Sequence, residues 1–358
     1  MSFDWQPRTR LIYGAGTVER VGELARELGC RPLLVTDPGL VKAGHADHVR
    51  RALPEAVVYD RCRENPTTKD VDACVAAARA AKTDLIVALG GGSSLDTAKG
   101  CNFVLTNGGR MQDYWGVGKA TKPMLPLIAI PTTAGTGSEC QSFALIADET
   151  THQKMACGDP KASARIAILD PTLTVTQPAK VTAATGMDAI AHAVETAVTR
   201  KRTELSAIYS REAFRLLAPN LPVVLREPQN LDARAAMQLG AAFAGTAIEN
   251  SMLGAAHSCA NPLTARHGVM HGTAVSVMLP HVVRFNADPR YSELAPDLPA
   301  LLTELLAVAG IPARLRDHGI TREVLPALAA EAAQQWTAQF NPRSISAADC
   351  EALYEAAW

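Results

Sequence analysis

The sequence has no excess of charge of either sign and few aromatic residues. Its 358 residues include 35 Lys and Arg against 36 Asp and Glu, so the formal net charge is −1, and aromatic residues make up 5%. Without a basic surplus, binding to the phosphate backbone of nucleic acid is disfavoured, and we expect no nucleic-acid partner. Hydrophobic residues make up 47%, which is enough for a sizeable core and excludes a disordered chain.

Long hydrophobic runs are also missing. Long charge-free stretches such as residues 123–138 and 251–265 are interrupted by Pro and Gly and fall short of the roughly 20 apolar residues that a membrane helix needs. Residues 1–7 lack the charged and apolar segments of a secretory signal. We therefore predict no membrane span and a cytoplasmic location.

The cysteines show no close pairing. They are scattered along the chain without a Cys-x-x-Cys motif, so neither a thiolate zinc site nor a dense disulfide framework is expected. We interpret them as reduced, buried thiols. The eight positions are Cys30, Cys62, Cys74, Cys101, Cys140, Cys157, Cys259 and Cys350.

The order of β-type and helical segments predicts two domains. Through about residue 170, short β-type runs alternate with amphipathic helical stretches, which is typical of a parallel sheet covered by helices. Beyond that point the chain consists of long segments rich in Ala, Leu, Glu and Arg. We predict an α/β, doubly wound parallel-sheet domain over residues 1–175 and an all-α helical domain over residues 176–358. The expected strands are 33–36, 56–59, 84–89, 125–130 and 166–169, with helices over 18–28 and 71–81.

A glycine-rich turn offers a phosphate-binding site. Gly90, Gly91, Gly92 and Ser93 follow an apolar strand and open a helix. Glycines let a ligand approach the backbone closely, and amides at the start of a helix favour an anion. The alternative is a plain strand-to-helix turn in which Ser93 and Asp96 form a capping box. The glycines alone leave both interpretations open.

A second loop, residues 131–139, follows the next expected strand and therefore lies at the carboxyl end of the same sheet, where ligands of open α/β sheets bind. Its hydroxyl groups include those of Thr132, Thr133 and Thr136. Asp37 follows an earlier strand, where its carboxylate can accept hydrogen bonds from an adenosine ribose and would repel a 2′-phosphate. This position favours NAD over NADP, with an exposed turn residue as the alternative.

A polar stripe on an apolar helix indicates a metal site. Asp188, His192 and Glu195 share one helix face, and the residues between them are mostly Ala, Val and Ile. A carboxylate in such surroundings costs several kcal/mol unless it is paired, protonated or bound to a metal. Three imidazoles and a carboxylate suit an Fe, Zn or Ni ion, although each His taken singly is more often a core or surface residue. Residues 254–272 supply further histidines, which are His257, His267 and His271.

Together, these motifs resemble the iron-containing (group III) alcohol dehydrogenase family, which includes maleylacetate reductases. The resemblance covers nearly the whole chain, and several separated motifs in the same order make it specific. It implies a Rossmann-like N-terminal domain and an all-helical C-terminal domain. The matching segments are residues 11–16, 36–40, 90–93, 132–139, 341–343 and 356–358.

The resemblance also implies roles for individual residues. By similarity, the metal ligands are Asp188, His192, His257 and His271, with Fe2+ as the expected ion and Zn2+ as the alternative. The implied cofactor-binding residues are Asp37, Gly90, Gly91, Gly92, Ser93, Asp96, Thr132, Thr133, Thr136 and Lys154. Many members carry a His-Pro pair where this chain has Asn261-Pro262. Asn does not titrate near neutral pH, so we expect His267, as a catalytic group, or a water molecule to replace it in proton transfer.

The predicted function is that of a metal- and NAD-dependent oxidoreductase that interconverts a small alcohol and its aldehyde or ketone. The metal acts as a Lewis acid that lowers the pKa of the alcohol, and the nicotinamide takes the hydride. The alternative is a lyase resembling 3-dehydroquinate synthase, which would need several basic residues beside the metal, where the chain offers Arg266 and Lys154. We expect a homo-oligomer, with a dimer favoured.

Overall fold

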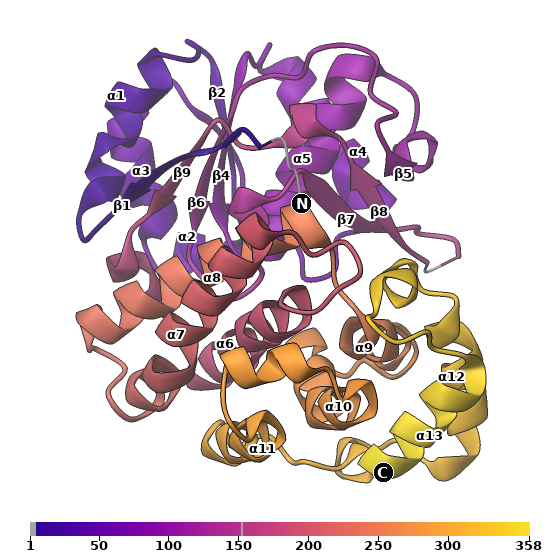
Figure 1. Ribbon diagram of the computed structural model, residues 1–358. Helices are drawn as coiled ribbons and strands as arrows, with labels where there is room; N and C mark the ends of the chain where they lie inside the picture. Colours follow the sequence, from indigo (N-terminus) through magenta and orange to yellow (C-terminus); the bar gives the residue numbers. More distant parts are fainter. Residues whose placement is uncertain (1–4, 152) are drawn as a thin grey trace. The chain divides into compact units, whose positions relative to one another are not determined.

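The computed structural model describes residues 5–151 and 153–358. Residues 1–4, part of the segment on which the prediction of no secretory signal rests, lie outside the described residues. The contacts divide the chain into two compact units (Figure 1). The α/β unit runs to Thr133 and resumes over Ser138–Thr176, and the helical unit comprises Ala134–Gly137 and Gln177–Trp358. The loop that the sequence analysis assigns to the first domain is thus shared between the two units.

Among the described residues, a six-stranded parallel sheet forms the centre of the α/β unit, in the order β1-β9-β6-β4-β2-β3. The chain runs outward from β2 to β3 and then returns to place β4 on the other side of β2. The winding therefore reverses between β2 and β4, and ligands of open sheets bind beyond the carboxyl ends at such a point. The strands are β1 (Arg10–Tyr13), β2 (Pro32–Val35), β3 (Val57–Tyr59), β4 (Leu85–Gly90), β6 (Leu127–Pro131) and β9 (Ile166–Leu169).

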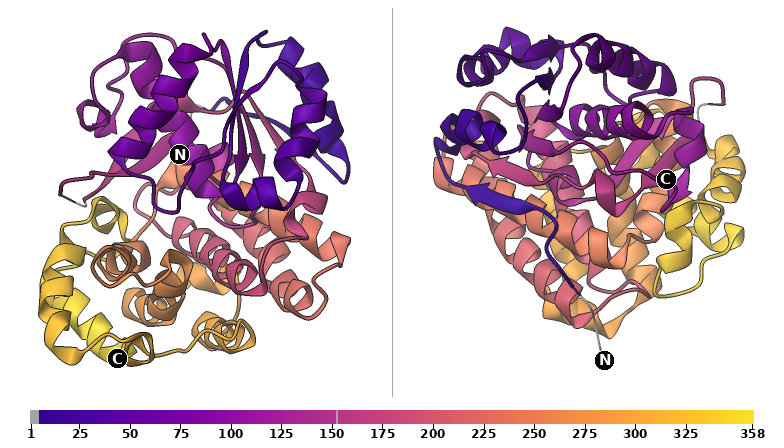
Figure 2. Two further views of the ribbon diagram at one scale, coloured as in Figure 1. Left: turned by 180° about the vertical axis from the view of Figure 1, so that it is seen from behind. Right: turned by 90° about the horizontal axis from the view of Figure 1, so that it is seen from above.

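Helices cover both faces of this sheet (Figures 1 and 2). Alternate strand residues point to opposite faces: Leu33 and Ile86 pack in one core with α4 and α5, and Leu34 and Val87 pack in another with α1 and α3. Burial on both faces is why these strands are apolar without alternation. The predicted doubly wound fold is confirmed. The helices are α1 (Val21–Arg26), α2 (Pro38–Lys42), α3 (His45–Ala52), α4 (Thr68–Ala80) and α5 (Gly92–Asn107).

Four strands were not predicted from the sequence. One is β1, and the others form a small sheet in the order β5-β8-β7. The three strands of the small sheet are short and contain Gly, Ala or Lys, which are weak strand formers. In β8, Gly158 is required because a Cβ atom there would overlap the ring of Phe143. The small sheet comprises β5 (Gly116–Val117), β7 (Phe143–Ala147) and β8 (Lys154–Gly158).

The helical unit is built around α6 (Ala179–Thr196), which packs against α7, α8 and α10. From Thr182 onward α6 is buried nearly all round, as its apolar composition predicts. Gly272 in the first turn of α10 allows a close approach to α6, because a Cβ atom there would overlap the Ala184 carbonyl group. The remaining helices are α7 (Glu204–Arg226), α8 (Leu231–Ser251), α9 (Ala255–His267), α10 (His271–Asn286), α11 (Leu298–Val308), α12 (Leu325–Ala333) and α13 (Ala347–Ala357).

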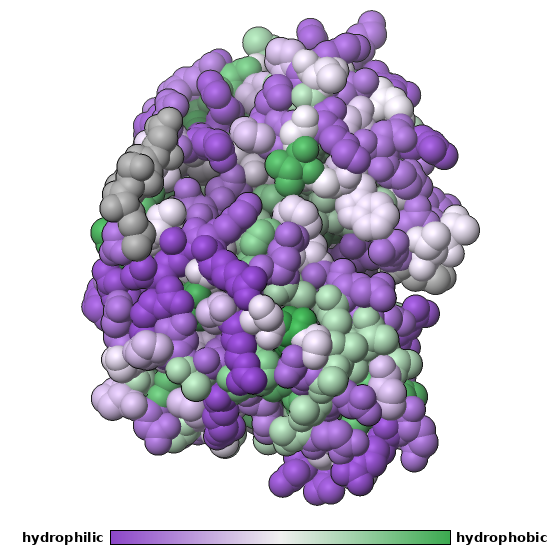
Figure 3. Space-filling view, turned by 45° about the vertical axis from the view of Figure 1, so that its right-hand side comes forward, coloured by the Kyte–Doolittle hydropathy of each residue, from purple (hydrophilic) through white to green (hydrophobic). Residues whose placement is uncertain are grey.

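The surface is polar over most of the face shown in Figure 3, with hydrophobic residues in smaller patches. None of the helices within the described residues is long and apolar enough to cross a membrane. This finding agrees with the interrupted apolar runs of the sequence.

Candidate functional site

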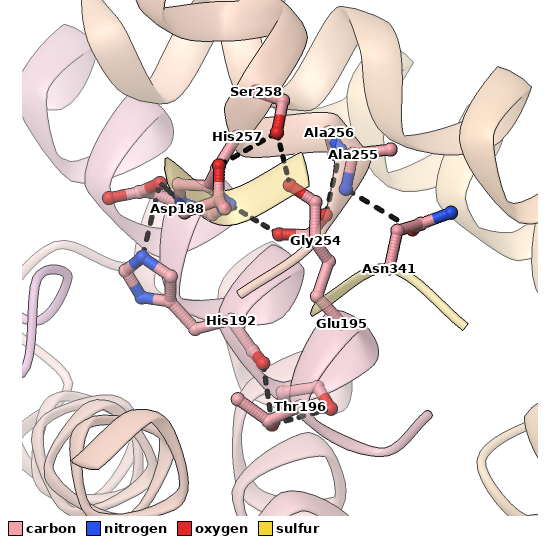
Figure 4. Close-up of polar contacts among 12 residues, drawn as sticks. Asp188, His192, Glu195, Thr196, Gly254, Ala255, Ala256, His257, Ser258 and Asn341 are labelled. Carbon is pink, nitrogen blue, oxygen red and sulfur yellow. Dashed lines mark hydrogen bonds and ion pairs between the residues drawn. The ribbon is translucent and has the colours of Figure 1, made fainter. Parts of the chain in front are cut away.

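The helical unit brings Asp188, His192 and His257 together (Figure 4). Asp188 and His192 lie one turn apart on α6, and His257 comes from the first turn of α9. The Oδ1 atom of Asp188 lies 3.6 Å from His192 Nε2 and 3.4 Å from His257 Nε2. The two imidazole rings stack with their centroids 4.8 Å apart. All three side chains are buried, with Asp188 and His257 each only 4% exposed.

The facing atoms of Asp188 and His257 fit a bound cation. Within the described part of the chain, neither Asp188 Oδ1 nor His257 Nε2 has a hydrogen-bond partner. Leaving such buried polar atoms unpaired costs about 1–3 kcal/mol each, and more for a charge. Two ligand atoms that each lie about 2.1 Å from a tetrahedral Zn2+ are about 3.4 Å apart. The observed separations of 3.4 and 3.6 Å therefore match two edges of a coordination shell.

Electrostatics in the cluster also favour a positive charge. Burial alone would raise the pKa of Asp188, but His192, His257 and His271 together bring it below its usual range. Burial would lower the pKa of His257, but Glu195 and Asp188 raise it to about 9. Burial lowers the pKa of His192. The two carboxylates thus stabilise either a proton on His257 or a metal cation in its place.

Glu195 orients His257. Its Oε2 atom lies 2.5 Å from His257 Nδ1, and its Oε1 atom accepts a hydrogen bond of 2.7 Å from the Ala256 amide. A proton on Nδ1 leaves the lone pair of Nε2 facing Asp188, which is the tautomer that a metal ligand needs. Glu195 therefore contacts a ligand candidate directly.

His271 lies beside this cluster. It is the first residue of α10, and its ring centroid lies 5.4 Å from that of His257. Its charge contributes to the lowered pKa of Asp188. Among the described residues, the group whose ligand atoms all lie within 4.8 Å of one another comprises Asp188, His192 and His257, so His271 is the outlying member of the four expected ligands.

His267 is not brought to the cluster. It is the exposed last residue of α9, ten positions after His257, which corresponds to about 15 Å along the helix axis. His267 is therefore not among the residues whose ligand atoms cluster in the described structure, and its role in proton transfer stays a prediction.

In the α/β unit, the glycine turn leaves its helix start open to a ligand. Gly90 ends β4 at a φ of 151°, and a Cβ atom there would lie 2.5 Å from Ser94 Oγ. Gly91 is the N-cap of α5 and has no side chain to cap the first turn. The alternative capping box is not formed, since Asp96 instead accepts a hydrogen bond of 2.9 Å from Ser138 Oγ. The amides that open α5 are thus suited to an anion.

Thr132 and Thr133 lie at this turn, and Asp37 lies at the end of the neighbouring strand β2. The Thr132 amide donates to the Gly90 carbonyl oxygen. A Cβ atom built on Gly91 would lie 3.1 Å from the Thr133 methyl group, so Thr133 lies directly beside the turn. Asp37 follows β2 across the switch point and caps α2 through the Leu40 amide, at 3.1 Å. Thr136 belongs to the segment Ala134–Gly137, which is part of the helical unit.

Lys154 opens β8, and its charge acts on Asp96. Burial raises the pKa of Asp96, and the charges of Lys99 and Lys154 oppose that effect. The charges of Asp96 and Lys154 therefore interact within the α/β unit.

The sequence reasoning missed Lys99, a fully buried cation in α5. Its ammonium group donates to the carbonyl oxygens of Ser138, Gln141 and Phe143 and to the Ser138 hydroxyl, at 2.6–3.1 Å. It fixes the segment that follows the hydroxyl-rich loop onto α5. The available signal was a Lys between apolar residues of one helix, which is more often a solvent-exposed residue.

The chain matches models of one protein family over nearly its whole length. The model described as iron-containing alcohol dehydrogenase matches residues 7–171, and the model of the C-terminal part of the Fe-containing alcohol dehydrogenase family matches residues 182–358.

Individual relatives agree with these matches. The chain is 34% identical to the NAD-dependent methanol dehydrogenase of Bacillus methanolicus over 362 residues, or 94% of this chain and 95% of that protein. Its structure is similar to that of a crystallised 1,3-propanediol oxidoreductase, with a TM-score of 0.97, 33% identity and full coverage of both chains. It also resembles the sulfoacetaldehyde reductase of Bifidobacterium kashiwanohense in complex with NAD+, with a TM-score of 0.91, 26% identity, and coverage of 100% of this chain and 99% of that one.

Proposed function

Because this chain belongs to the iron-containing alcohol dehydrogenase family, we propose that Asp188, His192, His257 and His271 hold the divalent metal ion of an alcohol dehydrogenase. The enzyme interconverts an alcohol and its aldehyde or ketone with NAD as the hydride carrier. The observation that carries the proposed ligand set is the buried pair Asp188 Oδ1 and His257 Nε2, which face each other at 3.4 Å and have no hydrogen-bond partner among the described residues. The ion is Fe2+, with Zn2+ as the alternative.

The protein's own residues prepare the metal site. When bound, the ion supplies the Lewis acidity that lowers the pKa of an alcohol oxygen. Asp188 supplies the negative charge, and His192 and His257 supply neutral nitrogens whose positions are set by α6 and α9. Glu195 keeps the Nδ1 proton on His257, and the buried Ala-rich surroundings exclude water.

All of the proposed cofactor contacts except Thr136 belong to the α/β unit. The nicotinamide accepts or donates the hydride. The amides of Gly91, Gly92 and Ser93 at the start of α5 bind the pyrophosphate. Asp37 accepts hydrogen bonds from the adenosine ribose and selects NAD over NADP, which is supported by its position at the end of β2. The remaining proposed contacts are Gly90, Asp96, Thr132, Thr133, Thr136 and Lys154.

The substrate is a small alcohol or aldehyde. The relatives named above act, by their names, on methanol, 1,3-propanediol and sulfoacetaldehyde. The lyase alternative is not favoured, because these relatives are dehydrogenases or reductases. We also propose a homo-oligomer, with a dimer favoured, and the cytoplasmic location stays a prediction.

The direct test is metal reconstitution. Apoprotein prepared with a chelator should show no NADH formation, and addition of Fe2+ or Zn2+ should restore it with at least one member of a panel of short alcohols. The reverse reaction should consume NADH with the corresponding aldehyde. Absence of turnover with every metal and substrate would overturn the proposal, and transient NADH that never accumulates would support the lyase instead.

A further inference from the structure

Helix α9, which carries His257, begins without a cap of its own. Its N-cap is Gly254, which has no side chain, so the first amides of the helix need acceptors from elsewhere. Two side chains from distant parts of the chain supply them. The Ala256 amide donates to Glu195 Oε1 at 2.7 Å, and the Ala255 amide donates to Asn341 Oδ1 at 3.2 Å.

Both acceptor atoms lie close to Gly254. A Cβ atom on Gly254 would lie 2.9 Å from Asn341 Oδ1 and 3.1 Å from Glu195 Oε1. A side chain at this position would therefore crowd both acceptor atoms at the helix start. Figure 4 shows Glu195 and Asn341 at this turn, with His257 just beyond it.

Asn341 is itself held rigidly. It is 1% exposed, and its Nδ2 atom donates to Asn286 Oδ1 and to the Arg343 carbonyl oxygen, both at 2.7 Å. Asn286 is the last residue of α10, the helix that begins with His271. One amide side chain thus links the start of α9, the end of α10 and the C-terminal segment of the chain.

We propose that Asn341 is a positioning residue for the metal ligand His257. It fixes Ala255, two residues before His257, while Glu195 fixes Ala256 and the imidazole itself. The inference rests on the proposed metal site. It adds that metal affinity depends on a side chain in the C-terminal segment that hydrogen-bonds to the backbone and to Asn286.

The test compares Asn341→Ala with the wild type by two readouts that do not need activity. The first is the Co2+ dissociation constant, measured by competition with a chromophoric chelator at a temperature well below unfolding. The second is the visible d–d spectrum of the Co2+ protein, which reports ligand geometry. The variant should bind Co2+ about tenfold more weakly, as is typical when a residue that orients a ligand is lost, and its spectrum should change in shape.

The matched control is Asn102→Ala in the α/β unit. Asn102 is equally buried, and its amide makes two hydrogen bonds with the backbone of Leu125. Its loss should lower the melting temperature but leave Co2+ affinity and spectrum unchanged. If Asn341→Ala does not fold, Asn341→Ser leaves a smaller cavity, its hydroxyl is too short to reach the Ala255 amide, and the same weakening is expected.

The outcomes separate this inference from the proposed function. Tight Co2+ binding with an unchanged spectrum in Asn341→Ala or Asn341→Ser, while the wild type binds Co2+ normally, would overturn the role of Asn341 and leave the metal site standing. A wild-type protein that binds no metal ion would overturn both.

Discussion

The imidazole of His257 lies between two carboxylates, with Nδ1 2.5 Å from Glu195 Oε2 and Nε2 3.4 Å from Asp188 Oδ1. The first contact is a hydrogen bond, whereas the two atoms of the second contact have no hydrogen-bond partner among the described residues. The hydrogen bond to Glu195 therefore holds the imidazole ring in one orientation. One nitrogen is anchored to the protein, and the other is presented to a cation.

Replacement of Glu195 should therefore weaken metal binding while helix α6 stays folded. We expect Glu195→Gln to lower the affinity for Zn2+ or Fe2+ by about 10-fold to 100-fold, because the amide no longer fixes the Nδ1 proton by charge. Competition with a chelator measures the effect. Glu204→Gln, at an exposed position at the start of α7, is the control, and equal affinities in both variants would contradict the assigned role of Glu195.

Substitution of His192 and substitution of His267 should have different effects on activity. His192→Ala removes a proposed ligand and should reduce kcat/KM by about 100-fold or more, whereas His267→Ala should change it by no more than about twofold, since His267 lies about 15 Å along α9 from His257. Steady-state assays of both variants from pH 6 to pH 9 decide the matter. A large, pH-dependent loss in His267→Ala would show that a proton does pass through His267, as expected from the sequence.

Asp37 should set the choice between NAD and NADP. Asp37→Ser keeps a side chain that can cap α2 through the Leu40 amide, but it removes the charge that repels a 2′-phosphate. The ratio of kcat/KM for NADP to that for NAD should rise by about tenfold or more. An unchanged ratio, in a variant whose melting temperature matches the wild type, would mean that Asp37 serves only as a helix cap.

Glu139 should make stability depend on pH. Burial raises the pKa of this carboxyl to about 7, above its value in the unfolded chain, so the folded state holds the extra proton between about pH 4.5 and 7. The free energy of unfolding should therefore fall as pH rises through this window. A shift of this size is worth about 3 kcal/mol.

Urea unfolding at pH 5 and pH 8 measures this effect. Glu139→Gln should gain stability relative to the wild type on going from pH 5 to pH 8, because the variant has no carboxylate to ionise. The exposed Glu55 provides a control in Glu55→Gln, which should show no such gain. A constant difference between Glu139→Gln and the wild type at both pH values would contradict the prediction.

Much of the architecture could be predicted because it depends on periodic patterns. The strands β2, β4, β6 and β9 are apolar runs bounded by turn residues. The burial of α6 could be predicted because the residues around Asp188 and His192 are mostly Ala, Val and Ile. The small β5-β8-β7 sheet could not be predicted in this way. Its strands are held by packing such as that of Phe143 over Gly158, which sequence periodicity does not report.

The candidate site was predictable for residues whose chemistry is unusual in their surroundings. Asp188 needs a cation wherever it is buried, so its sequence context was enough. Lys99 and Asn341 act through hydrogen bonds to the backbone of segments far away in the sequence, such as Phe143 and Ala255. Nothing in the local sequence of either residue indicates these partners, and only the folded chain brings them together.

The central claim is that one carboxylate and several imidazoles of the helical unit bind a single ion. X-ray absorption at the metal edge of the protein loaded with one equivalent of Zn2+ or Fe2+ tests it most directly. The account predicts nitrogen and oxygen ligands at about 2.0–2.2 Å with the multiple scattering of imidazole rings, and loss of the bound ion in Asp188→Ala. Sulfur ligands, or an ion that Asp188→Ala retains with an unchanged spectrum, would contradict it.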